Sequence, residues 1–233
     1  FAFRDAEGNV LGEEPDFIPA YSQVRLKSYF GRLNYTLLDR YIFTGTVRYD
    51  GSSRFSEDNR WGVFPALAFA WRINEESFLK NSSVITDLKL RLGYGVTGQQ
   101  DIGPEFPYLA RYTRGDNTAQ YQFGNTFYPT FRAEGYDTGI KWEETTTYNV
   151  GMDFGFANNR ITGSLDYFFK DTEDLLAEIN VAAGTNLTNR LFTNVGNMET
   201  QGLEAAVNFT AIDKERFTWN VGINGTYINQ EIT

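Results

Sequence analysis

The sequence of 233 residues contains no cysteine and no histidine. Without cysteine there are no disulfides, thiolate metal ligands or thiol nucleophiles, and without histidine the usual general base and the commonest zinc ligand are missing. We therefore expect a protein that is not an enzyme. The net charge of −9 and the pI near 4.7 also argue against nucleic acid as a partner, because nucleic-acid affinity comes largely from clustered Lys and Arg.

The sequence also lacks any apolar run near the roughly 18 to 20 residues that a membrane helix requires. Its N-terminal residues show neither the basic start nor the apolar core of a signal peptide. Hydrophobic residues make up 41% of the chain and the mean hydropathy is −0.42. These values still allow a membrane β-barrel, whose strands need apolar side chains only at alternate positions.

Apolar or glycine residues do alternate with other residues in eight segments, which is the period of a β-strand. No charged residue stands on these apolar faces. Most segments are longer than the five or six residues usual in soluble sandwiches, which favours strands that cross a membrane. The segments are residues 29–37, 41–49, 61–71, 88–96, 148–156, 161–169, 203–209 and 217–227.

The opposite faces of these segments are polar, as expected for a wall that lines a wet lumen. We predict a lumen-facing charge network in which the basic residues pair with the acidic ones, with Arg54 as a further basic member. The predicted lumen-facing residues are Arg48, Arg72, Lys89, Arg91, Asp153, Asp166 and Glu204.

Tryptophans occur where a membrane barrel carries its aromatic girdles. Trp61 and Trp71 share a face and stand 10 residues apart, which corresponds to roughly 25 Å along the membrane normal for a tilted strand. We place Trp61, Trp71, Trp142 and Trp219 in the girdles.

Short and long connections alternate along the chain, a pattern typical of outer-membrane barrels with short periplasmic turns and long extracellular loops. The connection 73–87 is periplasmic by parity, although it is longer and its residues 76–80 suit a helical turn. The long loops are residues 51–60, 98–141 and 171–198.

Aromatic residues interleave with polar ones in loop 98–141, and aromatic rings stack on sugars or pack against a protein lid. Phe123 and Tyr128 belong to the same set. The candidate ligand or lid contacts are Arg54, Phe106, Tyr108, Tyr112, Tyr121 and Phe127.

Two other sequence motifs do not support a ligand site. Residues 93–98 match GxGxxG, but the Gly and Pro that follow do not start the helix of a dinucleotide site. Acidic side chains around residues 50–59 and 171–174 make calcium conceivable, yet neither loop has EF-hand spacing. We expect no cofactor.

Several strings together resemble the SusC/RagA family of TonB-dependent outer-membrane transporters of Gram-negative bacteria. The likeness runs over nearly the whole chain in the right order. The strings are SYFGRLNY (28–35), RYDGSSRF (48–55), WGVFPALAFAWRI (61–73), LKLRLGYGVTGQQDIG (88–103), WEETTTYNVGMDF (142–154) and NVGNMETQGLEA (194–205).

This resemblance implies that residues 1–233 are part of a single β-barrel domain: consecutive antiparallel strands from a barrel of about 22 strands. The plug domain, the TonB-contacting segment, a signal peptide and the final strands would lie outside this sequence. The resemblance also implies import of oligosaccharides or peptides, TonB as energy source and a SusD-like surface lipoprotein as lid. Two alternatives stay open: a free-standing eight-stranded outer-membrane barrel with a structural or adhesive role, and a soluble carbohydrate-binding β-domain.

Overall fold

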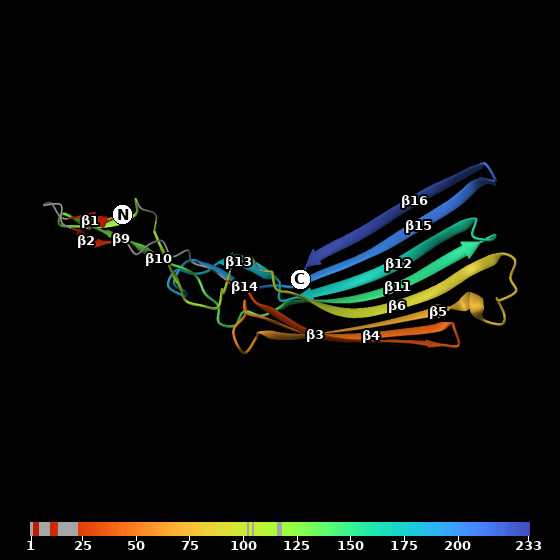
Figure 1. The fold of residues 1–233 in the computed structure, drawn as a ribbon, viewed down its shortest axis with the longest axis horizontal. Coiled ribbons are helices and arrows are strands. Elements are labelled where there is room, and N and C mark those ends of the chain that lie inside the picture. The colour runs from red at the N-terminus through yellow and green to blue at the C-terminus, as the bar shows by residue number, and fades with distance from the viewer. Residues whose placement is uncertain (1, 5–9, 14–22, 102, 104, 116–117) are drawn as a thin grey trace.

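The computed structural model describes residues 2–4, 10–13, 23–101, 103, 105–115 and 118–233, and most of these residues lie in β-strands (Figure 1). The long strands are β3 (Leu26–Leu37), β4 (Tyr41–Ser52), β5 (Trp61–Arg72), β6 (Ile85–Gln99), β11 (Glu143–Phe156), β12 (Ile161–Glu173), β15 (Met198–Lys214) and β16 (Phe217–Ile232). The short strands are β1 (Ala2–Arg4), β2 (Val10–Glu13), β7 (Tyr112–Arg114), β8 (Gln120–Phe123), β9 (Thr126–Pro129), β10 (Phe131–Ala133), β13 (Leu176–Asn180) and β14 (Arg190–Asn194), and η1 (Ile73–Glu75) is a 3₁₀ turn.

The eight long strands form one antiparallel sheet in the order β16-β15-β12-β11-β6-β5-β4-β3, so each strand pairs with its neighbour among the long strands along the chain. The sheet is open, because β3 and β16 lie at its two edges in the part of the chain that the structure describes. A free-standing barrel would pair Leu33 or Tyr35 with Ile223 or Gly225, and the described residues show no such pairing. That alternative receives no support.

The apolar side chains of the sheet point to solvent along its whole width. Leu33 is 72% exposed, Leu67 61%, Val150 48% and Ile223 72%. A soluble protein would bury such a face, since the largest apolar patch on a typical monomer is only a few hundred Å². The alternation therefore builds a sheet whose outer face suits hydrocarbon, as predicted for a segment of a membrane barrel and unlike the face of a soluble β-domain.

Tight turns join the strands at one end of the sheet (Figure 1). Leu38 and Asp39 both have positive φ, and so do the three residues Ala157, Asn158 and Asn159. Such backbone matches the right-handed twist of the flanking strands in short hairpins. The last turn consists of residues 215–216 alone, because β15 continues to Lys214 and β16 begins at Phe217.

The longer connection between β5 and β6 contains the predicted helical turn. The Lys80 backbone N–H donates to the Glu76 carbonyl over 2.8 Å. The Glu76 carboxylate then accepts hydrogen bonds from Tyr41 Oη at 2.6 Å, Arg40 Nη1 at 2.7 Å and Trp71 Nε1 at 3.0 Å. This carboxylate therefore fixes the connection to the ends of β4 and β5.

Among the residues that the structure describes, no helix has the length and apolar character to cross a membrane.

Candidate ligand site in the long loops

The hydrophobic core of the described residues lies at the loop end of the molecule. Phe55 and Ile140 are fully buried, and Phe64 and Trp142 are each 5% exposed. Val96, Tyr108, Leu176 and Phe192 pack against this cluster of four residues. The three long connections thus share one core, which we call the loop core.

Trp142 corrects one prediction, because it belongs to the loop core and not to a membrane girdle. Its ring lies 5.2 Å from the ring of Phe55 and 5.3 Å from that of Phe64, and its Nε1 donates to the Arg60 carbonyl over 3.1 Å. The prediction placed Trp142 at the start of its strand, where a girdle residue is expected, but β11 begins only at Glu143 and Trp142 lies in the loop before it.

The other three tryptophans lie on the long strands. Trp61 is 38% and Trp219 53% exposed on the apolar face, and Trp71 stacks on Tyr41 with ring centroids 6.2 Å apart. Their place in the girdles stays a prediction.

Polar side chains tie the long loops to one another. Asn194 Nδ2 donates to the carbonyls of Lys141 at 3.0 Å and Asp174 at 2.8 Å, and its Oδ1 accepts from the Lys141 N–H at 2.9 Å. Asn59 Nδ2 donates to the Gly139 carbonyl over 2.9 Å. Because these bonds cross sequence separations of 20 to 80 residues, the loops hold one another in place.

Loop 98–141 forms a long hairpin in which β7 pairs with β10 and β8 pairs with β9. Tyr121, Phe123 and Tyr128 share one face near its tip, since Tyr121 stands opposite Tyr128 in the register. They are 65%, 71% and 53% exposed, and we call them the aromatic face. Phe127 projects from the other side of the hairpin, opposite Gln122.

The predicted contact residues therefore do not gather in one place. Tyr112 is 64% and Phe127 58% exposed, whereas Tyr108 packs against the loop core and Phe106 meets Tyr108 edge to face. Arg54 departs from the prediction of a ligand contact, because its side chain is only 14% exposed and pairs with Asp101 at 3.2 Å. It joins the first long loop to the end of β6.

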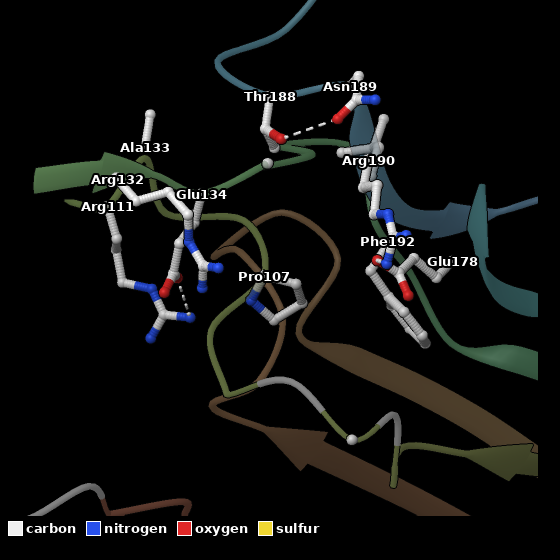
Figure 2. Close-up of a pocket in the computed structure, with 13 residues that line it drawn as sticks. Pro107, Arg111, Arg132, Ala133, Glu134, Glu178, Thr188, Asn189, Arg190 and Phe192 are labelled. Carbon is white, nitrogen blue, oxygen red and sulfur yellow. Dashed lines mark hydrogen bonds and ion pairs between the residues drawn. The ribbon is translucent and has the colours of Figure 1, made fainter. Parts of the chain in front are cut away.

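A cavity of about 830 Å³ lies between the hairpin of β7 and β10 and the hairpin of β13 and β14 (Figure 2). Its lining includes Pro107, Arg111, Arg132, Glu134, Glu178, Thr188, Arg190 and Phe192. Sequence analysis missed this site, since its residues come from three separate stretches of the chain. The signal in the sequence was the occurrence of four arginines, Arg111, Arg114, Arg132 and Arg190, in largely acidic loops.

Part of the predicted charge network forms around Asp153 and Asp166. Arg91 contacts Asp153 and Asp166, each at 2.9 Å, and Lys89 Nζ lies 3.4 Å from Asp153. Arg48 pairs instead with Asp50 on its own strand, at 3.1 Å. Within the described part of the chain, neither Arg72 nor Glu204 makes an ion pair.

Gly93 and Gly95 lie on the polar face of β6. A side chain at Gly93 would meet Asn149, and one at Gly95 would meet Ala66 on the neighbouring strand. β6 runs on to Gln99 with no helix after it, so the GxGxxG match is a strand sequence. The described residues bring together no group of three or more His, Cys, Asp or Glu side chains suited to a metal ion.

The sequence model of the family described as "TonB dependent receptor-like, beta-barrel" matches residues 2–233. The chain is 52% identical to the TonB-dependent receptor SusC of Bacteroides thetaiotaomicron over 208 residues, which are 89% of this chain and 21% of that protein. It is 34% identical to the TonB-dependent receptor P3 of Formosa agariphila over 223 residues, which are 96% of this chain and 22% of that protein. The chain thus spans about a fifth of the length of these relatives.

Solved structures give the same result. The structure of the RagAB peptide transporter matches with a TM-score of 0.79 and 26% sequence identity, over 90% of this chain and 22% of the other. The siderophore receptor PirA from Pseudomonas aeruginosa matches with a TM-score of 0.59 and 18% identity, over 91% of this chain and 35% of the other. The second match shows a common fold alone.

Proposed function

Because the chain belongs to the family of TonB-dependent receptor-like β-barrels, we propose that its strands form part of the wall of a transporter that imports glycans or peptides. The chain is a segment of an outer-membrane barrel of a Gram-negative bacterium. The whole transporter includes sequence outside this chain, and we assign to that sequence the plug and the contact with TonB. The wall itself carries out no catalysis in this proposal.

One observation carries the proposal. The sheet has an uncharged apolar outer face and a charged inner face, and long interlocked loops extend from one end of its strands. Leu67 and Val150 point outward while Arg91 and Asp153 meet on the other face. Hydrocarbon can solvate the first face and water the second. A passage for a hydrophilic nutrient needs this arrangement.

The loop end supports a role in capturing the nutrient and a protein lid. The aromatic face of Tyr121, Phe123 and Tyr128 is the kind of surface that stacks on sugar rings or packs against a partner. We assign to it a SusD-like surface lipoprotein. The loop core below the hairpin gives this surface a fixed base.

The experiment is deletion of the gene for the complete protein in its own organism, followed by uptake of labelled oligosaccharides and labelled peptides. We expect uptake of one nutrient class to fall to background and to return with the wild-type gene but not with a copy that lacks the TonB-contacting segment. Unchanged uptake of both classes would contradict the proposal.

A further inference from the structure

Three arginines and two glutamates supply the charged side chains of the cavity between the two loop hairpins (Figure 2). Arg111 pairs with Glu134 at 3.0 Å, so the charge of this arginine is balanced within the cavity wall. Arg190 lies 3.8 Å from Glu178, which is near the limit for an ion pair and too long for a hydrogen bond. Arg132 has no ion-pair partner among the residues that the structure describes.

The charges of this cavity therefore favour a single negative charge. Three guanidinium groups face two carboxylates, which leaves one positive charge in excess in a chain of net charge −9. The two glutamates would repel a dianion such as a phosphate monoester. A carboxylate carries one charge and matches the planar fork of arginine with two parallel hydrogen bonds.

The rest of the lining suits the uncharged part of a ligand. Pro107 is buried, and the ring of Phe192 leads from the cavity to the loop core. Thr188 and Asn189 add a hydroxyl and an amide at the rim. A volume of about 830 Å³ is within the range of small-molecule sites.

The two hairpins are held at a fixed separation, so the cavity exists before a ligand arrives. Asn186 Nδ2 donates to the Tyr136 carbonyl over 2.9 Å, and the Tyr136 N–H donates to Asn186 Oδ1 over 3.3 Å. Gly135 lies against the Arg190 backbone so closely that any side chain there would collide with its carbonyl. Preformed geometry reduces the ordering cost of binding.

We infer that this cavity binds a carboxylate group of the imported nutrient, held by Arg132 and Arg190. The inference rests on the proposed function and deepens it, because it makes the transporter selective for acidic nutrients. The carboxylate can belong to a uronic acid or to the end of a peptide, and the two arms of the experiment separate these sources.

The experiment uses the complete receptor purified in detergent, and titration calorimetry with two pairs of probes. One pair is a tripeptide with a free C-terminal carboxylate and its C-terminal amide, and the other is digalacturonate and its methyl ester. We expect the acid of one pair to bind at least about tenfold more tightly than its neutral partner, as for a charge-assisted hydrogen bond.

Variants then connect this preference to the cavity. Arg132→Gln should remove most of the preference while the neutral partner binds as before, and Glu178→Gln, which releases Arg190, should increase it. Arg216→Gln removes an exposed arginine in the turn at the opposite end of the sheet and should change neither affinity. A variant that merely damages the loops would weaken the acid and its neutral partner together.

Equal binding of acid and neutral partner in both pairs, or no binding of either acid at millimolar concentration, overturns the inference. So does a preference that survives both Arg132→Gln and Arg190→Gln. Since equilibrium binding in detergent needs no energy coupling, these results are separate from uptake in cells. A receptor that restores uptake without any preference for acids would keep the proposed function and lose this site.

Discussion

At the scale of single residues, the charge network on the inner face depends on a position without a side chain. Gly151 stands opposite Arg91 in the register and beside the contact between Arg91 and Asp166. A Cβ at this position would lie 2.8 Å from Arg91 Nη2 and would collide with Asp166 Oδ1. A Cβ at residue 151 would therefore displace the ends of both side chains from this ion-pair geometry.

Gly151→Ala should therefore destabilise the barrel by about 1 to 3 kcal/mol, because it displaces a partly buried charged pair. Thermal unfolding of the complete receptor in detergent measures the effect. Gly31→Ala is the matched control, since a Cβ at Gly31 meets nothing within 4 Å. An equal loss in both variants would show that the general cost of a strand substitution, and not the ion pair, determines the result.

Glu76 gives the turn end of the barrel a dependence on pH. The hydrogen bond from Tyr41, followed by that from Trp71, lowers the pKa of the Glu76 carboxyl below its usual value. A lowered carboxyl pKa stabilises the folded state above the unfolded pKa of about 4.3, and this stabilisation is lost as the pH falls through the folded value. The connection between β5 and β6 should loosen in acid.

Limited proteolysis of the residues 73–84 between pH 6 and pH 3 tests this expectation. Wild-type receptor should become more sensitive to cleavage as the pH falls below about 4.3, whereas Glu76→Gln, which cannot ionise, should show little change over the same range. A wild-type profile that is flat down to pH 3 would mean that the three hydrogen bonds to Glu76 do not depend on its charge.

At the scale of elements, sequence predicted the strands well and the loops poorly. The alternation of apolar and polar residues located all eight long strands and their faces. Each residue of a membrane strand faces either lipid or water, so its polarity indicates its face. Some of the predicted segments were too short. β6 starts at Ile85 and ends at Gln99, beyond the predicted residues 88–96, since the alternation fades where the strand leaves the apolar band.

The loop core could not be predicted because its members are far apart in the chain. Phe55, Phe64 and Ile140 come from three segments with no common period, and only the folded loops bring them together. The cavity between the two loop hairpins could not be predicted for the same reason, because its lining residues are far apart in the chain. By contrast, the pairing of Arg91 with Asp153 was predictable, because both residues stand on polar faces of strands that sequence analysis had already placed.

The aromatic face of the long hairpin leads to a prediction about the lid. Replacement of Tyr121, Phe123 and Tyr128 by serine should reduce co-purification of the proposed lipoprotein partner by at least about tenfold, because exposed aromatic rings commonly carry much of an interface's binding energy. The loop core lies elsewhere, so folding should be unaffected.

Phe127→Ser is the matched control for the aromatic face, because Phe127 is exposed on the other side of the same hairpin. It should retain the partner. Loss of the partner in Phe127→Ser but not in the triple variant would assign the contact to the opposite side of the hairpin.

At the scale of the whole molecule, the sheet has one face for lipid and one for water, and the tryptophans report on this division. Trp219 is 53% exposed on the outer face, whereas Trp142 is 5% exposed in the loop core. In bilayers of brominated lipid, Trp219→Phe should lower the quenchable fraction of the fluorescence and Trp142→Phe should raise it. The reverse pattern would place the loop core in the bilayer.

The loop core, at one end of the molecule, is more constrained in sequence than the lipid-facing wall. Acyl chains are fluid and adapt to any shape, so outward positions such as Leu33 and Ile223 can exchange freely among aliphatic and aromatic residues. Phe55, Ile140 and Trp142 pack closely in one buried cluster, so a change in the size of one side chain requires a compensating change in another. Homologues should therefore diverge in residue identity around the wall while keeping these few positions nearly invariant.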